Sequence, residues 1–367
     1  MKNHKNIYIG AMSGTSHDAI DVSILKIEKN FTLDFFHSKR IPNSLRNRIK
    51  NIMESDTVTL DELGQLNKKI GYLFAQAINE SIEQSKLKRN KVKCVAISGQ
   101  TIRHDVAIAN PFSMQIGDPN VVCHETGLTT ISDFRNMHIS LGGEGAPLVP
   151  EFHNELFHSP RKSKIILNVG GIANYSYVKN KNHLWGSDVG PGNALMDAYC
   201  QKYLNKPFDK DGKIASQGKV NSRELRKLLL HKFFKQKFPK STGKELFNLN
   251  MLSKQFLKES PENILATLVE FTAISVDKSI KANNHTFDEF IVCGGGGKNK
   301  FLIKRLAAIL NNEVILSNAY GYDIQAFESM AFAWMGYKRI NNQVMKVQLG
   351  KNKFNKGMLG SIIQIKP

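Results

Sequence analysis

Short apolar runs at the start of the chain predict β-strands. Residues 7–11 are almost wholly apolar, residues 20–27 open with apolar and polar side chains in alternation, and residues 31–36 have the pattern of a third strand. Alternation with a period of two is typical of a strand with one buried face. Because a polar turn at residues 13–18 separates the first two runs, this part of the chain predicts a β-meander.

From Thr59 onward the hydrophobic period becomes helical. The apolar positions recur at the spacings of one helix face and are Leu60, Leu63, Leu66, Ile70, Leu73, Ala77 and Ile82. Thr59 and Glu62 form a capping box that marks the start of the helix. A second long helix is expected to begin at Pro261, with Ser260 as its N-cap.

A second cycle of strand, glycine turn and strand begins near the middle of the chain. Residues 165–169 and 173–178 flank a turn at Gly170 and Gly171. A buried strand at 289–293 and a helix at 299–310 follow later, much as a buried strand at 92–97 follows the first cycle. The repeated layout, without a linker, predicts an α/β fold of two related α/β lobes that share a cleft.

The expected lobes have boundaries that follow this repeat. The first lobe is expected at residues 1–138 and the second at 139–345. The Lys-rich tail, 346–367, ends in a strand-like run at 361–365, and it is a candidate to complete the first lobe. The hydrophobic pattern does not by itself assign the tail to either lobe.

Composition excludes several classes of protein. Of the 367 residues, 41% are hydrophobic and 23% are charged, as in soluble globular proteins. No apolar stretch approaches the roughly 18–20 residues that cross a bilayer, and the apolar run at the N-terminus is too short for a signal peptide. The four cysteines lack zinc-ligand spacing, and Cys94 and Cys293 lie in strand-like runs. We therefore expect buried, reduced thiols, no zinc, no membrane partner and a cytoplasmic location.

The net charge of +19 has two interpretations. It can attract a polyanion such as ATP or nucleic acid, or it can be a solvated basic surface. The densest basic stretch, residues 232–244, interleaves Phe233, Phe234 and Phe238, which could stack on bases. We expect an amphipathic helix there instead, and no nucleic-acid partner, because no nucleic-acid-binding motif occurs elsewhere.

Three glycine-rich loops carry the candidate chemistry. The first, residues 13–21, combines small residues and hydroxyls, which suit a phosphate cradle, with Asp18 and Asp21, of which Asp18 could hold hydrated Mg²⁺. Taken alone, a plain hairpin turn is the better explanation. The second loop places Asp188 among glycines, where it could accept a proton from a hydroxyl or water. An Asx-turn is an equally good explanation of that loop.

The third loop contains four consecutive glycines after a buried strand. Such a run allows close approach to a flat or anionic ligand such as adenosine, although it has neither Walker nor dinucleotide-binding spacing. The glycines are Gly294, Gly295, Gly296 and Gly297. Three such loops spread along the chain together predict an ATP-dependent phosphotransferase. Polar residues at Arg103, Asp133, Arg135 and Glu144 could bind a sugar bearing a carboxylate, with surface ion pairing as the alternative.

These strings, taken in order, resemble the anhydro-N-acetylmuramic acid kinase family over nearly the whole chain. The matching strings are GAMSGTSHDAID from Gly10, SGQTIRH from Ser98, QIGDP from Gln115, DFR from Asp133, GGEGAPLVP from Gly142, NVGGIAN from Asn168, DVGPGNALMD from Asp188, DKDG from Asp209, PKSTGKELFN from Pro239 and ESMAFAW from Glu328. Combinations such as GAPLVP with GPGNALMD are highly specific. Departures from the usual family pattern occur at His17, Ala19, Ser98 and Val189.

The resemblance implies a fold, a reaction and a set of site residues. The fold would be that of hexokinase, actin and Hsp70. ATP and Mg²⁺ would be the cofactors, and the family's amino-sugar substrate would be opened by water at C1 while O6 receives the γ-phosphate. Asp188 would be the catalytic base, and Asp18 would organise the metal. The nucleotide would meet Gly14, Thr15, Ser16, His17, Asp18, Ala19, Ile20, Asp21, Gly170, Gly171, Gly190, Gly192, Asn193 and Gly294 to Gly297. The sugar would meet Gln100, Arg103, Asp133, Arg135, Glu144 and Glu328.

Two alternatives remain open at this point. A kinase of the same fold that acts on another anhydro- or amino-sugar would share the ATP loops without adding water at C1. A nucleotide-driven binding protein like Hsp70 or actin would bind ATP without making a sugar product. Relatives in the family are commonly dimers, so the resemblance also implies a homodimer.

Overall fold

The chain divides into two compact α/β units. The structure, a computed structural model, describes residues 6–14, 16–180, 183–243, 246–350 and 353–365. The first unit comprises Met1–Leu148, Gln325–Leu349 and Lys353–Pro367, and the second comprises Val149–Ile324 and Gly350–Asn352. No helix among the described residues is both long and apolar enough to cross a bilayer. The division lies at residue 148 rather than at the expected 138, and the chain returns to the first unit at 325 rather than at 346.

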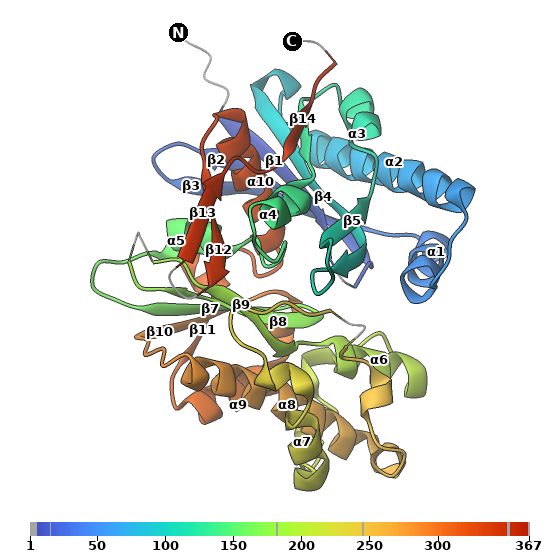
Figure 1. Cartoon of the computed structure of the whole chain (residues 1–367), viewed down its shortest axis with the longest axis vertical. Helices are drawn as coiled ribbons and strands as arrows, with labels where there is room; N and C mark the ends of the chain where they lie inside the picture. The colour runs from blue at the N-terminus through green and yellow to red at the C-terminus, as the bar shows by residue number, and fades with distance from the viewer. Residues whose placement is uncertain (1–5, 15, 181–182, 244–245, 351–352, 366–367) are drawn as a thin grey trace. The chain divides into compact units, whose positions relative to one another are not determined.

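The first unit is built on a seven-stranded mixed sheet in the order β14-β6-β4-β1-β2-β3, with β5 paired to β4 (Figure 1). Its strands are β1 (Ile7–Ser13), β2 (Ala19–Ile27), β3 (Phe31–Arg40), β4 (Val92–Asp105), β5 (Phe112–Ile116), β6 (Thr130–Ser132) and β14 (Ser361–Ile363). The pairs β1–β2 and β2–β3 are antiparallel, which confirms the predicted meander. β14 pairs with β6, so the tail belongs to this sheet.

Helices cover both faces of the first sheet. They are α1 (Asn43–Glu54), α2 (Leu60–Gln84), α3 (Pro119–Thr126), α4 (Phe134–Ser140) and α10 (Phe327–Ile340). The Thr59 hydroxyl accepts from the Glu62 amide, which confirms the predicted cap of α2. Ile9 and Ile24 pack in the cluster that contains the apolar face of α2. The alternate residues, Gly10 and Ser23, face α10 instead.

The position of α10 explains why the expected lobe boundary differs from the observed one. The Ser23 hydroxyl lies 2.6 Å from that of Ser329, and α10 also packs on β1 and β4. Beyond it, β12 (Met345–Gly350) and β13 (Lys353–Gly357) form a separate ladder. The side-chain amide nitrogen of Asn355 on β13 donates to the Leu141 carbonyl at 2.6 Å. The chain therefore returns to the first unit one helix earlier than its hydrophobic pattern indicates.

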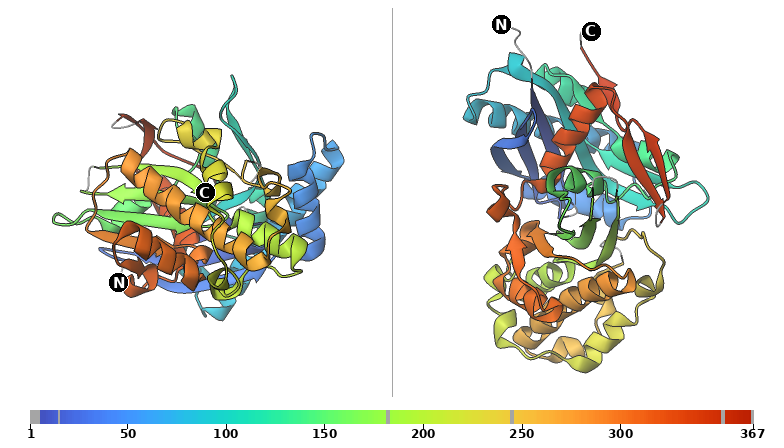
Figure 2. Two further views of the ribbon diagram at one scale, coloured as in Figure 1. Left: turned by 90° about the horizontal axis from the view of Figure 1, so that it is seen from below. Right: turned by 90° about the vertical axis from the view of Figure 1, so that its left-hand side faces the viewer.

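The second unit carries a five-stranded sheet in the order β11-β10-β7-β8-β9. Its strands are β7 (Lys164–Val169), β8 (Ile172–Val178), β9 (Gly186–Pro191), β10 (Glu289–Cys293) and β11 (Val314–Leu316), and its helices are α5 (Pro150–Phe157), α6 (Ala194–Tyr203), α7 (Ser222–Leu229), α8 (Pro261–Ala282) and α9 (Lys300–Leu310). The Ser260 hydroxyl caps α8 as predicted. α8, in orange, runs along one face of the sheet (Figure 2).

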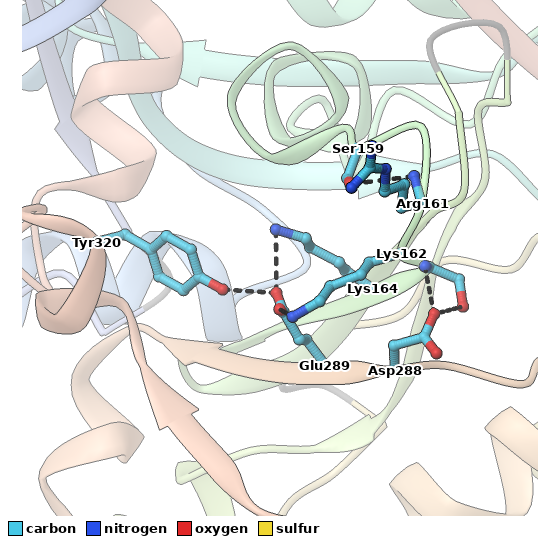
Figure 3. Close-up of polar contacts among 8 residues, drawn as sticks. Ser159, Arg161, Lys162, Lys164, Asp288, Glu289 and Tyr320 are labelled. Carbon is cyan, nitrogen blue, oxygen red and sulfur yellow. Dashed lines mark hydrogen bonds and ion pairs between the residues drawn. The ribbon is translucent and has the colours of Figure 1, made fainter.

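A charged cluster ties together the amino ends of β7 and β10 (Figure 3). The Glu289 carboxylate accepts from Lys162 Nζ at 2.5 Å, Lys164 Nζ at 3.0 Å and Tyr320 Oη at 2.7 Å. Burial raises the pKa of Glu289, but these hydrogen bonds outweigh burial and lower its pKa to about 2. The glycine-rich loops at Gly170 and Gly294 follow the carboxyl ends of the same two strands. The charged cluster therefore stabilises the ends of the strands that lie away from these loops.

The predicted amphipathic helix over the basic stretch is wrong. Within the described residues 232–243, helical structure is limited to the 3₁₀ turn Lys232–Lys235. Pro239 has no amide hydrogen to donate in a helix, and the phenylalanines pack around one lysine instead of lining a helix face. Cys94 and Cys293 are buried and carry reduced thiols, as expected.

Candidate functional site

Asp188 lies inside strand β9, with its carboxylate held by a segment distant in the chain. Its amide donates to the Lys240 carbonyl at 3.0 Å. The Thr242 amide donates to Asp188 Oδ2 at 2.8 Å, and the Ser241 hydroxyl lies 3.5 Å from the same oxygen. Asp188 is only 5% exposed. The residue is paired with Asn174 in the sheet, and the contacts from residues 240–242 orient its carboxylate.

A row of polar side chains crosses the second sheet beside Asp188. The register pairs Asn168 with Asn174 and Asn174 with Asp188 on three neighbouring strands. Directly paired residues share one face of a sheet, so these side chains form a line. The Asn174 Oδ1 atom is buried and has no hydrogen-bond partner among the described residues. A buried acceptor of this kind indicates a place for a water or a ligand group.

The two glycine turns next to this row are locked to each other by backbone hydrogen bonds. The Gly192 amide donates to the Gly171 carbonyl at 2.9 Å, and the Asn193 amide donates to the Gly170 carbonyl at 2.8 Å. A Cβ at Gly192 would lie 2.2 Å from the Gly170 carbonyl oxygen. Close backbone packing therefore requires glycine at position 192. Gly190, with φ of 151°, lies beside Ser275 of α8.

The four-glycine loop lies against the same turns. A Cβ at Gly294, where φ is 83°, would lie 2.4 Å from Asn168 Oδ1, and one at Gly296 would lie 2.3 Å from Val169 Cγ1. A Cβ at Gly297 would meet Ile324 at 2.2 Å. At Gly295, which is exposed, a Cβ would meet nothing within 4 Å. Packing thus accounts for three of the glycines, and Gly295 is the open position of the loop.

In the first unit, the predicted phosphate loop is a turn anchored by Gln100. The buried Ser13 hydroxyl donates to Gln100 Oε1 at 2.6 Å, and Gln100 Nε2 lies 3.5 Å from the Gly14 carbonyl. The Ser16 hydroxyl donates to the carboxylate of the exposed Asp18. His17 has a left-handed backbone, with φ of 42°. Thr15 lies outside the described residues.

The rest of the predicted nucleotide stretch belongs to strand β2. Ala19, Ile20 and Asp21 are its first residues, and the Ser38 hydroxyl donates to Asp21 Oδ1 at 2.5 Å. Ile20 is buried in the core beneath α2. The described part of this loop therefore divides into a polar turn, residues 14 and 16–18, and a strand whose side chains alternate between the core and the surface.

The structure joins Arg135 to two histidines, whereas Arg103 has a different partner. Arg135 donates to the Gly145 carbonyl at 2.9 Å, and the Gly145 amide donates to His138 Nδ1 at 3.0 Å. Burial, and then the charge of Arg135, lowers the pKa of both His104 and His138 to about 4. Arg103 donates to the Ser55 carbonyl at 2.9 Å. Both histidines are therefore neutral hydrogen-bonding groups at pH 7.

The remaining predicted sugar residues have separate surroundings. Asp133, with φ of 56°, accepts from the side-chain amide nitrogen of Asn136 at 2.8 Å. Glu144 is half-buried, and burial raises its pKa. Glu328 lies in the first turn of α10. Among the described residues, no group of three or more His, Cys, Asp and Glu side chains is placed to hold a metal ion.

Several site residues had no local signal in the sequence. Thr242 contacts Asp188 across 54 positions, and the line of Asn168 and Asn174 depends on strand register. His104 and His138 become neighbours of Gly145 only in the fold. The quoted strings PKSTGKELFN and NVGGIAN contain Thr242 and both asparagines, so the resemblance was the one available signal for them.

Comparison with known proteins identifies relatives over nearly the whole length of the chain. A family model described as anhydro-N-acetylmuramic acid kinase matches residues 6–364. A relative of that name from Gamma-proteobacterium EBAC31A08 is 58% identical over 362 residues, which cover 99% of each chain. A relative of the same name from Pasteurella multocida strain Pm70 is 40% identical over 351 residues, covering 93% of this chain and 92% of the relative.

A solved structure resembles the fold. Component A of (R)-2-hydroxyglutaryl-CoA dehydratase from Acidaminococcus fermentans aligns with a TM-score of 0.50 and 12% sequence identity. The alignment covers 91% of this chain and 99% of that chain. At this identity the similarity concerns the fold alone.

Proposed function

The chain belongs to the anhydro-N-acetylmuramic acid kinase family, and from that premise we propose how its residues perform the family's reaction. Its fold is of the hexokinase, actin and Hsp70 type. It is an ATP-dependent kinase that converts 1,6-anhydro-N-acetylmuramic acid to N-acetylmuramate 6-phosphate in peptidoglycan recycling. The observation that carries the residue assignment is the buried, oriented carboxylate of Asp188.

Asp188 is the proposed general base. A water molecule attacks C1 of the sugar, and Asp188 accepts a proton from that water as the bond between C1 and O6 breaks. O6 takes the γ-phosphoryl group of ATP, and ADP leaves. The Thr242 amide donates to Oδ2 and stabilises the carboxylate in its ionised form. Asn174 lies in register with Asp188 and could hold the same water.

The glycine-rich loops are the proposed nucleotide site. Gly295 would approach the adenosine, and the turns at Gly170 and Gly192, which carry no side chains, would let the phosphates come close to the backbone. Asp18 beside Ser16 fits Mg²⁺ because a single exposed carboxylate suits an ion that keeps most of its waters. Bound there, the ion would neutralise phosphate charge.

Arg135 and Glu144 are the proposed contacts for the sugar. Arg135 would pair with the carboxylate of the muramic acid, and the neutral ring of His104 beside it adds a polar group. His104 Nε2 is buried and has no hydrogen-bond partner among the described residues, which supports a ligand group there. Gln100, Arg103, Asp133 and Glu328 complete the proposed set.

The location and the oligomeric state of the protein are proposed from its membership of the family. We expect a cytoplasmic homodimer that does not bind nucleic acid, with the net charge of +19 spread over a solvated surface. Light scattering coupled to gel filtration measures the mass of the particle. A mass near 41.2 kDa, that of one chain, would overturn the dimer.

Isotope incorporation tests the reaction directly. The protein is mixed with Mg-ATP and 1,6-anhydro-N-acetylmuramic acid in ¹⁸O-water, and the masses of the products are measured by mass spectrometry. A sugar 6-phosphate with one ¹⁸O at C1, formed together with ADP, is the expected result. A phosphorylated sugar with its anhydro ring intact would show that Asp188 activates a hydroxyl instead. ATP turnover that does not depend on sugar would favour the nucleotide-driven binding protein.

A further inference from the structure

Lys240 is a buried lysine inside an aromatic cage. Its side chain comes from the basic stretch, yet the residue is only 5% exposed. The ammonium nitrogen lies 4.1 Å from the ring centre of Phe233, 4.3 Å from that of Phe238 and 5.7 Å from that of Phe234. It also donates to the Phe233 carbonyl at 3.0 Å. Cation–π contacts of this kind stabilise a desolvated ammonium.

The backbone of Lys240 is bound to the strand that carries Asp188. The Asp188 amide donates to the Lys240 carbonyl at 3.0 Å, and the Lys240 amide donates to the Ser187 hydroxyl at 2.9 Å. The Ser187 hydroxyl in turn lies 3.1 Å from the Lys240 carbonyl. Two residues further on, the Thr242 amide reaches Asp188 Oδ2. The aromatic cage thus anchors the segment that orients the carboxylate.

The two charges also act on each other. Burial lowers the pKa of Lys240 to about 8, and the negative charge of Asp188 opposes that shift. Since the interaction is mutual, the Lys240 cation favours the ionised form of Asp188. Among the described residues, Asp188 on β9 is the charged group that acts on the pKa of Lys240. On its own segment, His231 accepts from the amide of Phe233, one of the caging residues. The same segment carries the exposed Lys232, Lys235 and Lys237. The caging rings do not titrate.

We propose that Lys240 is a positioning residue for Asp188: its buried cation keeps the carboxylate ionised, and its caged side chain anchors the segment whose amide binds Oδ2. The inference rests on the proposed role of Asp188 as the base. It assigns this part of the basic stretch to the reaction rather than to a nucleic acid or a solvated face.

Replacement by methionine separates the charge from the packing. Lys240→Met keeps the length of the side chain, and Lys237→Met removes an exposed lysine of the same segment as the matched control. We expect Lys240→Met to lower kcat at pH 7 by about 30-fold or more, with KM for ATP little changed. The acidic limb of its pH–rate profile should move to higher pH. A kcat and profile equal to those of Lys237→Met would overturn the proposal.

A titration without turnover provides a second test, which also applies if Lys240→Met fails to fold. The side-chain NMR signal of Lys240 is followed against pH in the whole protein and in Asp188→Asn. The titration midpoint of Lys240 should move to lower pH in the variant, because the negative charge that raises the pKa of Lys240 has been removed. An unmoved midpoint would overturn the coupling. If the midpoint moves but Asp188→Asn keeps its kinase activity, the coupling is supported and Asp188 is rejected as the base. Failure of the coupling and failure of the proposed base can therefore be told apart.

Discussion

The Thr242 amide donates to Asp188 Oδ2 at 2.8 Å although the two residues lie 54 positions apart. A hydrogen bond to a carboxylate is stronger than one between neutral groups, and Asp188 itself is buried, so the carboxylate is held in one orientation. The Lys240 carbonyl accepts a hydrogen bond from the backbone amide of Asp188. Asp188 is thus placed by β9 on one side and by residues 240–242 on the other.

Asp188→Asn should fold and bind ATP but lose turnover. The amide oxygen of asparagine can still accept from Thr242, whereas the side chain can no longer accept a proton from water. We expect kcat to fall by about 1,000-fold, as measured by sugar-dependent ADP release. Asp61→Asn, at an exposed position in the first turn of α2, is the matched control and should keep its activity. Activity within a few-fold of the parent would make the assignment of the base wrong.

Gly295→Ala separates nucleotide contact from stability. A Cβ at this position meets nothing within 4 Å, so the melting temperature should be unchanged. If the loop touches adenosine, the added methyl group would obstruct it, and we expect KM for ATP to rise by about 10-fold. Gly350→Ala, also open, is the control outside the loop. An unchanged KM for ATP would remove Gly295 from the nucleotide site.

Gly10→Ala should destabilise the first unit through a single methyl group. Its Cβ would lie 1.9 Å from the Ser329 carbonyl oxygen and 2.4 Å from the Ala333 amide nitrogen, and both atoms belong to the backbone of α10. We expect a loss of about 3 kcal/mol or more in the free energy of unfolding, as measured by urea denaturation. Gly64→Ala, exposed in α2 with nothing within 4 Å, should instead gain up to about 1 kcal/mol. Equal effects of the two changes would contradict the packing of α10 on β1.

Stability should fall in mild acid because three histidines are buried in their neutral form. Burial lowers the pKa of His104 and His138 to about 4 and that of His153 to about 3, with Arg135 adding to the first two shifts. The unfolded chain binds these protons near pH 6.5, so the stability they contribute is complete above that pH and is lost as pH falls toward 4.

Urea denaturation at pH 7, 6 and 5 measures this dependence. Each histidine should contribute a slope of up to about 1.4 kcal/mol per pH unit within that window. His153→Gln can still bond to Ser176 and should flatten the slope, whereas His124→Gln, at an exposed site, should not. A free energy of unfolding that stays constant from pH 7 to pH 5 would contradict the buried, neutral histidines.

Structural features that depend on near neighbours could be predicted from the sequence. The caps at Thr59 and Ser260 each involve a hydroxyl and an amide three residues away, and the structure has both. The meander and the buried strand β10 follow from apolar runs that are readable residue by residue. The glycine loops were recognisable as special because runs of glycine are costly to order.

Features that depend on pairing between distant segments were decided by the tertiary structure. The return of the chain to the first unit at α10, the pairing of β14 with β6 and the cage around Lys240 each join residues with no periodic relation. The amphipathic helix predicted at residues 232–244 was wrong for this reason, since the phenylalanines pack around one buried cation. The hydrophobic period relates residues that are a few positions apart on one helix or strand. The contacts that orient Asp188 form only when two segments that are distant in the sequence pack against each other.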